Sequence, residues 1–344
     1  MYKKILITGG AGFIGSHLAG KLARKGHEVT IFDNLDPQVH CNESADLMED
    51  CTNKGVGFIH GDVRDYDMLA RAVKGQEWIF HLAAAVGVGQ AQYEIKHYVD
   101  VNVGGTANLL DILVKKKNKT KKLMVASSMS IYGEGPRRHG NPIPVPEGAS
   151  PEVNSIYGLT KKAQEDMCLN FGRTYNFPTV ALRYFNIYGP GQSLSNPYTG
   201  VIAIFLSRLK NNEAPVIYED GLQTRDFISV HDIVDATILA TERDEANYQV
   251  FNVGTGKPQT ILKVAETLAR LLEKDIKPKI THKHRKGDVR HCYADIKEIK
   301  NSLGWKPHID LEQGLKEVVE WSNSQKAEDK FNIATKELME KGLI

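Results

Sequence analysis

The first 185 residues alternate short apolar, β-branched runs with longer amphipathic segments, and this alternation leaves few folds open to the chain. The runs include KILIT, EVTIFD, WIFHLAA, KLMVASS and TVALRYF, and the segments between them include IGSHLAGKLARKG and SIYGLTKKAQEDMCLNFGRTY. Strands buried on both faces read as continuous apolar runs, and strands joined through helices run parallel. The sequence therefore predicts an α/β fold, with a doubly wound sheet of six or more parallel strands covered by helices.

The pattern changes after Asn186, where IYGPGQSLSNPYTG is rich in Gly, Pro and Ser. RDFISVHDIVDATILATE and YQVFNVG again have the pattern of a sheet and its covering helix, before TILKVAETLARLLEK starts a different segment. We therefore expect two interleaved domains, with 1–185 and 226–255 in the larger and 186–225 and 256–325 in the smaller one. Residues 326–344 are polar and are expected to form a surface helix or tail.

Charge and cysteine content argue against several classes of function. A net charge of +2 is too small to attract nucleic acid or an anionic membrane. We interpret KKKNKTKK, from Lys115 to Lys122, as a solvated helix end rather than an anion-binding patch. Four scattered cysteines without CxxC spacing indicate neither a disulfide framework nor a zinc site, so we expect no metal and a reducing cytoplasm. MYKKILITGG is neither signal peptide nor anchor, and no apolar run approaches the ~18 residues that span a bilayer.

The stretch KILITGGAGFIGSHL predicts a phosphate-binding turn. It contains both Gly10-x-Gly12-x-x-Gly15 and Gly9-x-x-Gly12-x-x-Gly15, directly after a strand and at the start of a helix. The spacing alone is a weak signal, but this placement allows a tight turn and close approach of the backbone to a pyrophosphate. Asp33 ends the second strand about 20 residues later, where a carboxylate binds ribose hydroxyls and repels a 2′-phosphate. No Arg follows soon after, so NAD is predicted rather than NADP.

The third strand ends in GDVRD, where Asp62 would reach an adenine amino group and Val63 its ring. Taken alone, Asp62 is better explained as a helix N-cap.

The stretch SIYGLTKK places Tyr157 four residues before Lys161, on one face of a predicted helix. Roughly one Tyr-x-x-x-Lys pair is expected by chance in such a chain, so this pair requires support from other motifs. An ammonium beside a phenol favours the phenolate and lowers a pKa that starts near 10. A tyrosine in this setting suits general acid–base catalysis.

With the glycine turn, HLAAA at 81–85, SSMSIYG at 127–133 and YGLTK at 157–161, the chain resembles the extended short-chain dehydrogenase/reductase family over residues 4–321. Within that family it is most similar to enzymes that modify the sugar of a nucleotide-sugar. The resemblance implies a Rossmann-type NAD-binding domain and a smaller C-terminal domain that binds a nucleotide-diphospho-sugar. It also implies a homodimer formed through two long helices, here at 99–117 and 155–175.

The resemblance also implies the roles of individual residues. Tyr157 would be the acid/base, Lys161 its electrostatic partner, and Ser128 the hydroxyl at the reacting oxygen, with Ser130 as the alternative. The residues implied at the cofactor are Gly9, Gly12, Phe13, Ile14, Gly15, Asp33, Asn34, Asp62, Val63, Leu82, Ala83, Ala84, Asn102, Tyr157, Lys161 and Tyr184. Those implied at the substrate are Val86, Ser128, Ser130, Tyr157, Asn186, Gln192, Tyr218, Arg225, Arg285, Asp288 and Arg290.

Each substrate residue also has a plainer explanation. Arg225 and Asp226 could form a surface ion pair, Arg285 could be a solvated loop charge, and Tyr218 could lie at the edge of the core. The resemblance instead implies that Asn186 and Arg225 contact the diphosphate and that Tyr218 flanks the nucleobase.

The residues after Ser128 bear on the reaction. If Tyr157 takes the proton of a C4 hydroxyl while a hydride passes to NAD, the product is a 4-keto sugar. Dehydratases of the family place Asp-Glu directly after the catalytic hydroxyl residue, where this chain has Met129 and Ser130, which cannot do that proton chemistry. Epimerisation requires only that the keto sugar turn in its pocket, so we expect a 4-epimerase.

The sugar is less well determined. Many UDP-galactose 4-epimerases have a Lys at the position held here by Val86, which puts galactose in doubt. The segments DNLDPQVH, AAAVGVGQAQYEI and SSMSIYGEG are similar to those of dTDP-L-rhamnose 4-epimerases. Alternatives are a UDP-glucuronate epimerase or decarboxylase, with Arg285 or Arg290 on the carboxylate, and another dehydratase or dehydrogenase of the family. A non-catalytic NAD-sensing regulator is the alternative of another class.

Overall fold

The large sheet of the computed structural model, which describes residues 2–40, 55–115, 119–198 and 200–344, is wholly parallel. Its strand order is β12-β8-β5-β4-β1-β2-β3, so the order reverses between β1 and β4. In open sheets of this kind, ligands bind beyond the carboxyl ends of the strands at that reversal. The strands are β1 Lys4–Thr8, β2 Glu28–Asp33, β3 Gly57–His60, β4 Trp78–His81, β5 Lys122–Ser128, β8 Thr179–Tyr184 and β12 Val250–Val253.

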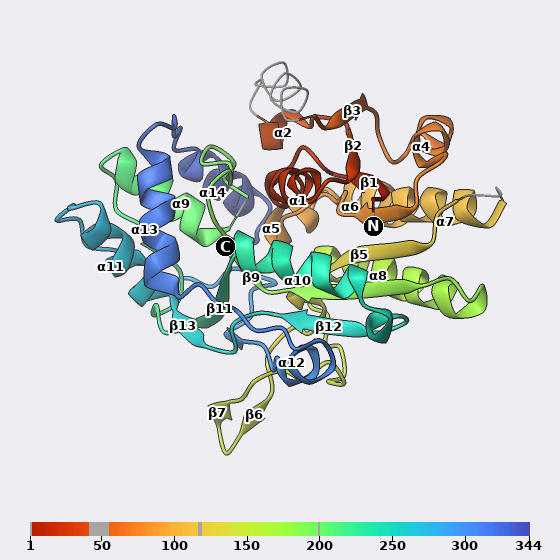
Figure 1. Ribbon diagram of the computed structural model, residues 1–344. Helices are drawn as coiled ribbons and strands as arrows, with labels where there is room; N and C mark the ends of the chain where they lie inside the picture. The colour runs from red at the N-terminus through yellow and green to blue at the C-terminus, as the bar shows by residue number, and fades with distance from the viewer. Residues whose placement is uncertain (1, 41–54, 116–118, 199) are drawn as a thin grey trace.

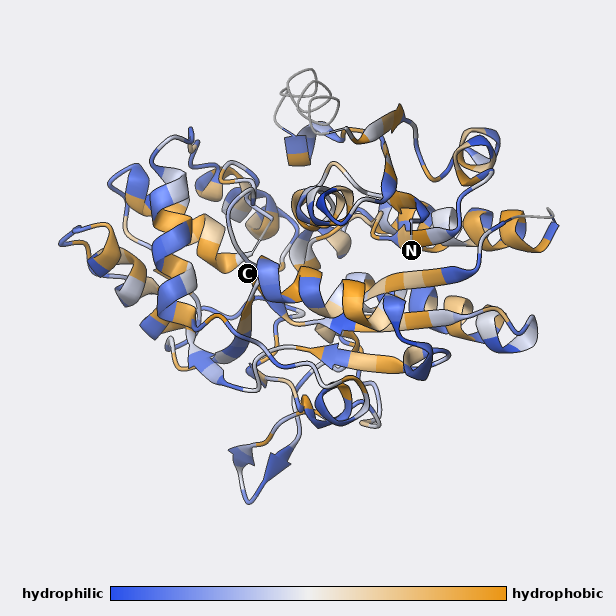
Figure 2. Ribbon diagram, viewed as in Figure 1, coloured by the Kyte–Doolittle hydropathy of each residue, from blue (hydrophilic) through white to orange (hydrophobic). Residues whose placement is uncertain are grey.

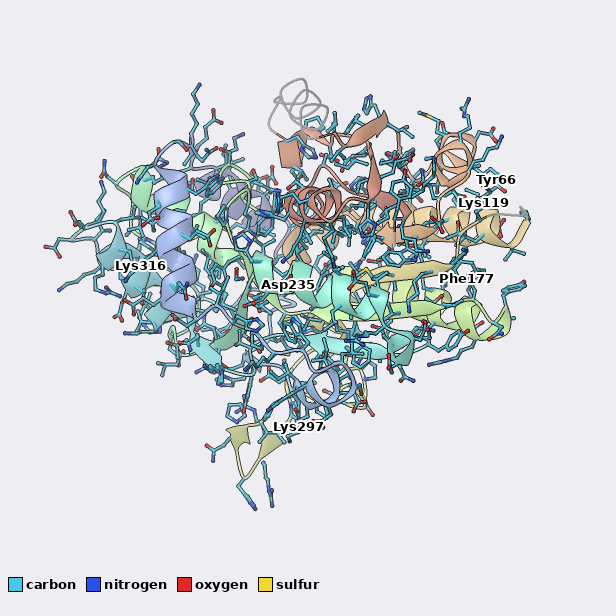
Figure 3. The ribbon with its side chains drawn as sticks, in the orientation of Figure 1. Tyr66, Lys119, Phe177, Asp235, Lys297 and Lys316 are labelled. Carbon is cyan, nitrogen blue, oxygen red and sulfur yellow. The ribbon has the colours of Figure 1, made fainter. Side chains whose placement is uncertain are left out.

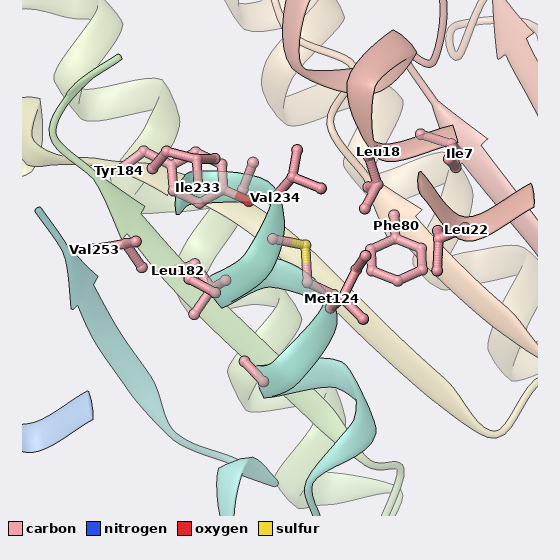
Figure 4. Close-up of a cluster of buried hydrophobic side chains, with 14 of the residues drawn as sticks. Ile7, Leu18, Leu22, Phe80, Met124, Leu182, Tyr184, Ile233, Val234 and Val253 are labelled. Carbon is pink, nitrogen blue, oxygen red and sulfur yellow. The ribbon is translucent and has the colours of Figure 1, made fainter. Parts of the chain in front are cut away.

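Helices cover both faces of this sheet, which confirms the predicted doubly wound α/β fold. Successive residues of a strand point to opposite faces, and accordingly Ile7 packs in one core cluster and Leu6 in the other. Figure 4 shows part of the first cluster, with Leu18 and Ile233 from two helices and Met124 from the sheet. The helices of that face are α1 Phe13–Arg24, α10 Val230–Glu242 and α12 Lys297–Leu303. Those of the other face are α4 Tyr66–Val73, α7 Gly105–Lys115 and α8 Ile156–Thr174.

The two long helices differ in detail from the prediction. The expected helix at 99–117 begins as a π-helix, Val99–Gly104, and continues as α7 to Lys115. Helix α8 begins after Ser155, whose hydroxyl accepts a hydrogen bond from the amide of Gly158 at 3.1 Å and so caps the helix.

The prediction of a solvated helix end is wrong for Lys122. This residue starts β5 and is buried, and its ammonium donates to the carbonyl of Arg243 at 3.0 Å and to the side chain of Asn247. Burial lowers the pKa of Lys122 to about 8.

A smaller lobe is formed by the segments that follow Asn186. Figure 1 shows its helices at one end of the molecule and the large sheet at the other. Its strands are β9 Asn186–Tyr188, β10 Val216–Ile217, β11 Thr224–Ser229, β13 Pro258–Thr260, β14 Lys279–Ile280 and β15 His291–Cys292. Its helices are α9 Val201–Lys210, α11 Ile261–Leu271, α13 Leu311–Ser322 and α14 Phe331–Glu340.

The chain passes between the two lobes more than once. Strand β11 pairs with β9, β13 and β15 of the smaller lobe, whereas α10 packs on the large sheet and β12 joins it. We propose the predicted interleaved division into two domains, with two changes. The larger domain resumes at Val230 rather than at 226, because β11 belongs to the smaller lobe, and it also includes α12, which packs on the large sheet.

The remaining elements are short. The hairpin of β6, Arg137–Arg138, and β7, Asn141–Pro142, projects from the molecule and is strongly hydrophilic, in contrast to the apolar strands of the large sheet (Figure 2). Lys297 and Lys316 extend outward from α12 and α13 (Figure 3). Among the helices of the described residues, none combines the length and apolar character needed to cross a bilayer. The remaining short helical elements are α2 Pro37–His40, α5 Val88–Ala91, α6 Ile95–Tyr98 and the 3-10 turns Met129–Ile131 and Asp244–Ala246.

Candidate active site

A cavity of about 620 Å³ lies at the carboxyl ends of the large sheet and extends into the smaller lobe. Every residue predicted at the cofactor or the substrate lines it, except Asn102 and Arg290. Residues more than 270 positions apart in the sequence, such as Gly9 and Arg285, therefore share one cavity.

The glycine turn has the shape that a bound pyrophosphate requires. A Cβ added to Gly9, which has a φ of +70°, would lie 2.7 Å from the amide nitrogen of Ala83, and one added to Gly15 would lie 2.4 Å from the carbonyl of Gly9. Gly12 begins helix α1 without a side-chain cap, so the first amides of the helix lie free beside the cavity. Such amides bind anions.

Asp33 is held in place at the end of β2. Its carboxylate accepts hydrogen bonds from the amides of Ala11 at 3.0 Å and Leu35 at 2.9 Å, and the side chain is buried. Asp36 and Asp62 line the same part of the cavity. Three carboxylates here would repel a 2′-phosphate, so this chain fits NAD and not NADP.

Asp62 is not a helix N-cap. Helix α4 is capped by Asp65, whose side chain accepts from the amide of Met68 at 2.9 Å. The Asp62 carboxylate instead accepts from the guanidinium of Arg64 at 2.7 and 2.9 Å and from the amide side chain of Asn34 at 2.9 Å. Burial alone would raise the pKa of Asp62, but these hydrogen bonds outweigh it and lower the pKa to about 2.

Tyr157, Lys161 and Ser128 all line the cavity. Tyr157 and Lys161 come from α8, and Ser128 is the last residue of β5. Ser130 donates from its amide to the Ser128 hydroxyl at 3.2 Å, and the two hydroxyls are 3.0 Å apart. This arrangement favours Ser128 at the reacting oxygen and Ser130 as its support.

The expected lowering of the Tyr157 pKa by Lys161 is not found. Burial raises the pKa of Tyr157 to about 12, against a smaller lowering by its hydrogen bond with Ser128. Burial also lowers the pKa of Lys161 to about 8. In this structure desolvation dominates, because both groups lie in the interior.

A buried polar chain continues from Lys161 below the cavity. The Lys161 ammonium donates to Gln164, whose amide nitrogen donates to the Thr106 hydroxyl at 2.8 Å. His81 lies between Thr106 at 3.0 Å and Thr8 at 2.7 Å. Burial and the charge of Lys161 lower the pKa of His81 to about 3, so this histidine is neutral.

Asn102 and Arg290 lie outside the cavity lining. Asn102 is fully buried; its side chain accepts from the amide of Ala85 at 2.7 Å and donates to the hydroxyl of Thr160 at 2.9 Å. It therefore holds the loop that follows β4 against α8. Arg290 forms ion pairs with Glu219 at 2.6 Å and Asp220 at 2.7 Å.

Arg225 is a half-buried cation without a carboxylate partner among the described residues. Its guanidinium donates to the main-chain carbonyls of Thr224, Val289 and Arg290, and desolvation lowers its pKa. Asp226 points away and accepts from main-chain amides, including that of Gly256 at 2.8 Å, so no Arg225–Asp226 ion pair forms. A partly desolvated cation without a counter-charge favours an anion beside it, and a phosphate in the cavity would supply one.

Other polar residues of the cavity are also consistent with a phosphate beside Arg225. The buried Oδ1 of Asn186 has no hydrogen-bond partner in the described part of the chain. Arg285 is paired with Asp288 at 2.8 Å, and its guanidinium lies 5.9 Å from the ring centre of Tyr218. Tyr218 is therefore at the cavity wall and not at the edge of the core.

The sequence prediction missed part of the lining. The Nε2 of His40 lies 3.6 Å from the Oδ1 of Asp33. Phe331 and Leu338 of α14 close one side of the cavity. His40 belongs to a helix of four residues, too short for a periodic signal. In α14 the apolar spacing of Phe331, Ala334 and Leu338 was a usable signal of a buried face.

The profile of the NAD dependent epimerase/dehydratase family matches residues 5–254. The chain belongs to this family. Membership confirms the predicted family, its Rossmann-type fold and NAD as its cofactor.

Relatives in the NAD-dependent epimerase/dehydratase family differ in the sugar they act on. A dTDP-L-rhamnose 4-epimerase of Burkholderia thailandensis is 34% identical, with 93% of this chain and 94% of the relative aligned. A UDP-N-acetyl-α-D-glucosaminuronate decarboxylase of Bacillus cytotoxicus is 33% identical over 93% of this chain and 98% of the relative. The crystal structure of UDP-glucose 4-epimerase from Thermotoga maritima with UDP-glucose has a TM-score of 0.84 and 34% identity, covering 94% of this chain and 99% of that one.

Proposed function

We propose that this protein is an NAD-dependent epimerase that inverts C4 of a nucleotide-diphospho-sugar through a 4-keto intermediate. The observation that carries the proposal is the shared cavity: Tyr157, Ser128 and Lys161 line the same cavity as the glycine turn and Arg225. A dinucleotide at the glycine turn and a diphosphate at Arg225 would share this cavity with the tyrosine.

The protein's own side chains would handle the proton and the position of the sugar. The chemistry that bound NAD supplies is reversible acceptance of a hydride from carbon. Tyr157 takes the proton from the C4 hydroxyl and returns it, while the Ser128 hydroxyl hydrogen-bonds the same oxygen. With NAD bound, the Lys161 ammonium and the positive nicotinamide would both favour the phenolate, against the burial that raises the pKa of Tyr157 in the ligand-free protein. The keto sugar turns over while Arg225 and Asn186 hold the diphosphate, and hydride return to the other face gives the epimer.

The charges of the lining favour a neutral sugar over a uronic acid. Arg285, one of the two cations considered for a sugar carboxylate, is already paired with Asp288. Arg290, the other, lies outside the lining and is paired with Glu219 and Asp220. Val86, Ser130 and Asn154 near the catalytic residues carry no charge. A 6-deoxy sugar such as that of dTDP-L-rhamnose suits the apolar Val86, and UDP-glucose is the second candidate.

Incubation with dTDP-L-rhamnose, UDP-glucose and UDP-glucuronate, followed by NMR of the products, tests this proposal. We expect a C4 epimer from a neutral sugar and a loss of at least about 10³-fold in Tyr157→Phe. Release of carbon dioxide would identify a decarboxylase, and stoichiometric free NADH a dehydrogenase. Binding of NAD without turnover of any sugar would favour the sensing regulator.

A homodimer through α7 and α8 is part of this proposal. Val114, Leu159 and Tyr175 on these helices are 44%, 53% and 57% exposed, and a groove between the helices is lined by apolar residues including Leu110 and Phe171. Contiguous exposed apolar side chains of this kind mark protein contacts. Light scattering of the wild type and of Leu159→Glu would give the mass of a dimer and of a monomer. A cytoplasmic location stays a prediction from the cysteine content.

A further inference from the structure

We propose that the C-terminal helix α14 straps the loop after β4 to the smaller lobe, with Glu337 as a positioning residue that sets the sugar side of the cavity. The inference rests on the proposed function, since it assigns this wall to the sugar. It concerns the segment 326–344, which was expected to be a surface helix or tail.

The residues on both sides of α14 contact the smaller lobe. Arg208 of α9 is buried and pairs with Asp329, just before α14, at 2.8 Å. The same guanidinium lies 4.8 Å from the ring centre of Phe331 and donates to the carbonyl of Ala214 at 2.7 Å. After α14, the carbonyl of Leu343 accepts from the amide of Lys286, next to Arg285, at 2.9 Å. Both flanks of the helix are thus fixed, beside α9 at the lobe end seen in Figure 1.

The other contact is with the loop that follows β4. The Glu337 carboxylate accepts hydrogen bonds from the phenols of Tyr93, at 3.1 Å, and Tyr198, and these two phenols are 3.0 Å apart. Tyr93 follows α5 in the loop after β4, whereas Tyr198 precedes α9 in the smaller lobe. One carboxylate therefore joins three segments that come from both sides of the cavity.

Apolar contacts continue this junction into the cavity wall. Leu338 is buried and lies so close to Gly89 that a Cβ there would be 3.2 Å from its methyl group. Gly87 has a φ of +147°, and a Cβ there would be 3.4 Å from Tyr198 and 2.8 Å from the hydroxyl of Tyr98. Val86, Gly87 and Gly89 all line the cavity. Their position therefore depends on Leu338 and on the hydrogen bonds of Glu337.

The expected effect on catalysis follows from the position of Gly87, Gly89 and Leu338 in the cavity wall. They border the cavity beyond β4, next to Val86, and they do not touch the glycine turn or Asp33. Loosening the strap would enlarge the space for the sugar and weaken its binding in ground and transition state alike. Such a change raises KM and leaves kcat unchanged.

Glu337→Leu tests the strap, and Glu340→Leu is the matched control. Glu340 lies on the same helix with its side chain 61% exposed, and among the described residues its one ion pair is with Lys336. Using whichever of UDP-glucose and dTDP-L-rhamnose the wild type converts faster, we expect KM to rise about 10-fold in Glu337→Leu with kcat within about 2-fold. We expect Glu340→Leu to match the wild type, and Glu337→Gln, which keeps a hydrogen-bond acceptor, to recover most of the affinity.

A purely structural role gives a different result. Partial unfolding lowers the number of active molecules, so apparent kcat would fall at constant KM. That outcome, or an unchanged KM in Glu337→Leu, overturns the proposal. Trypsin cleavage at Lys326, Lys330, Lys336 and Lys341 is a second measurement, and it should be faster in Glu337→Leu than in Glu340→Leu.

The outcome stays distinct from that of the proposed function. If the wild type converts no nucleotide-sugar, the proposed reaction fails. Calorimetry then measures the Kd for UDP-glucose in the two variants. A Kd about 10-fold weaker in Glu337→Leu than in Glu340→Leu supports the strap, whereas equal Kd values overturn it.

Discussion

The Lys161 ammonium donates a hydrogen bond to Gln164, three residues further along α8, and Gln164 connects it to Thr106 of α7. An ammonium has three donors. The partner that fixes Lys161 in this structure therefore comes from its own helix, and two N–H groups remain for the phenolate of Tyr157 and a ribose hydroxyl. Gln164 is a positioning residue for the proposed catalysis.

Replacing Gln164 by Leu should reduce kcat about 10-fold with little change in KM. The lost acceptor favoured the charged form of Lys161, so the pKa of Lys161 should fall and the alkaline decline of kcat should move to lower pH. Gln164→Glu should move that decline to higher pH. Profiles of kcat from pH 6 to 10 check both, and equal profiles in the two variants would contradict the role of Gln164.

Lys161 should also make the stability of the ligand-free protein depend on pH. Its pKa is lowered from 10.5 to about 8 on folding, so between these values the unfolded chain binds more protons than the folded one. Stability therefore rises with pH through this window and is lost again as pH falls through about 8. Between pH 7 and pH 10.5, the free energy of unfolding of the wild type should increase by up to about 3 kcal/mol relative to that of Lys161→Met. Urea unfolding of both proteins measures the difference, and a constant difference would refute this linkage.

The two serines after β5 should differ in their effect on catalysis. Ser128 interacts with Tyr157 and is expected at the C4 oxygen, so Ser128→Ala should lower kcat about 100-fold. Ser130 supports Ser128 through its amide, which an alanine retains, so Ser130→Ala should stay within about 5-fold. Steady-state kinetics distinguish the two, and the reverse order would assign the reacting oxygen to Ser130.

Arg225 and Arg290 offer a matched pair for diphosphate binding. Arg225→Lys keeps the charge but cannot contact carbonyls and a phosphate together, so the Kd for UDP should weaken about 10- to 100-fold. Arg290→Lys should leave it unchanged, because Arg290 lies outside the lining and its guanidinium is already paired with Glu219 and Asp220. Titration calorimetry with UDP measures both, and similar losses in the two variants would contradict the assignment.

The features that depend on local spacing were predictable from the sequence. The turn from Gly9 to Gly15 and the pair Tyr157 and Lys161 each lie within one strand–helix unit, so their geometry follows from the element that carries them. The family resemblance implied Arg225 and Tyr218 at the substrate, and both residues line the cavity. The expected positions of Arg225 and Tyr218 came from matching family motifs. Sequence spacing alone does not give the distance between the two lobes.

What the sequence left out depends on contacts between distant segments. The hydrogen bonds of Asn102 with Ala85 and Thr160, which join the loop after β4 to α8, could not be predicted from spacing. The pKa of Tyr157 was expected to fall beside Lys161, but burial of both groups decides its direction. Burial is a property of the assembled fold, and a helical spacing carries no information about it.

The order in which the large sheet is completed bears on synthesis of the protein. Helix α10 and strand β12 cover and extend this sheet, yet the ribosome makes them only after the whole excursion from β9 to β11. Until Val253 has emerged, the nascent chain exposes the open edge of β8 and the apolar face that α10 later covers. Exposed edges and apolar faces invite aggregation, so a stalled or truncated product ending before α10 should depend on chaperones to stay in solution.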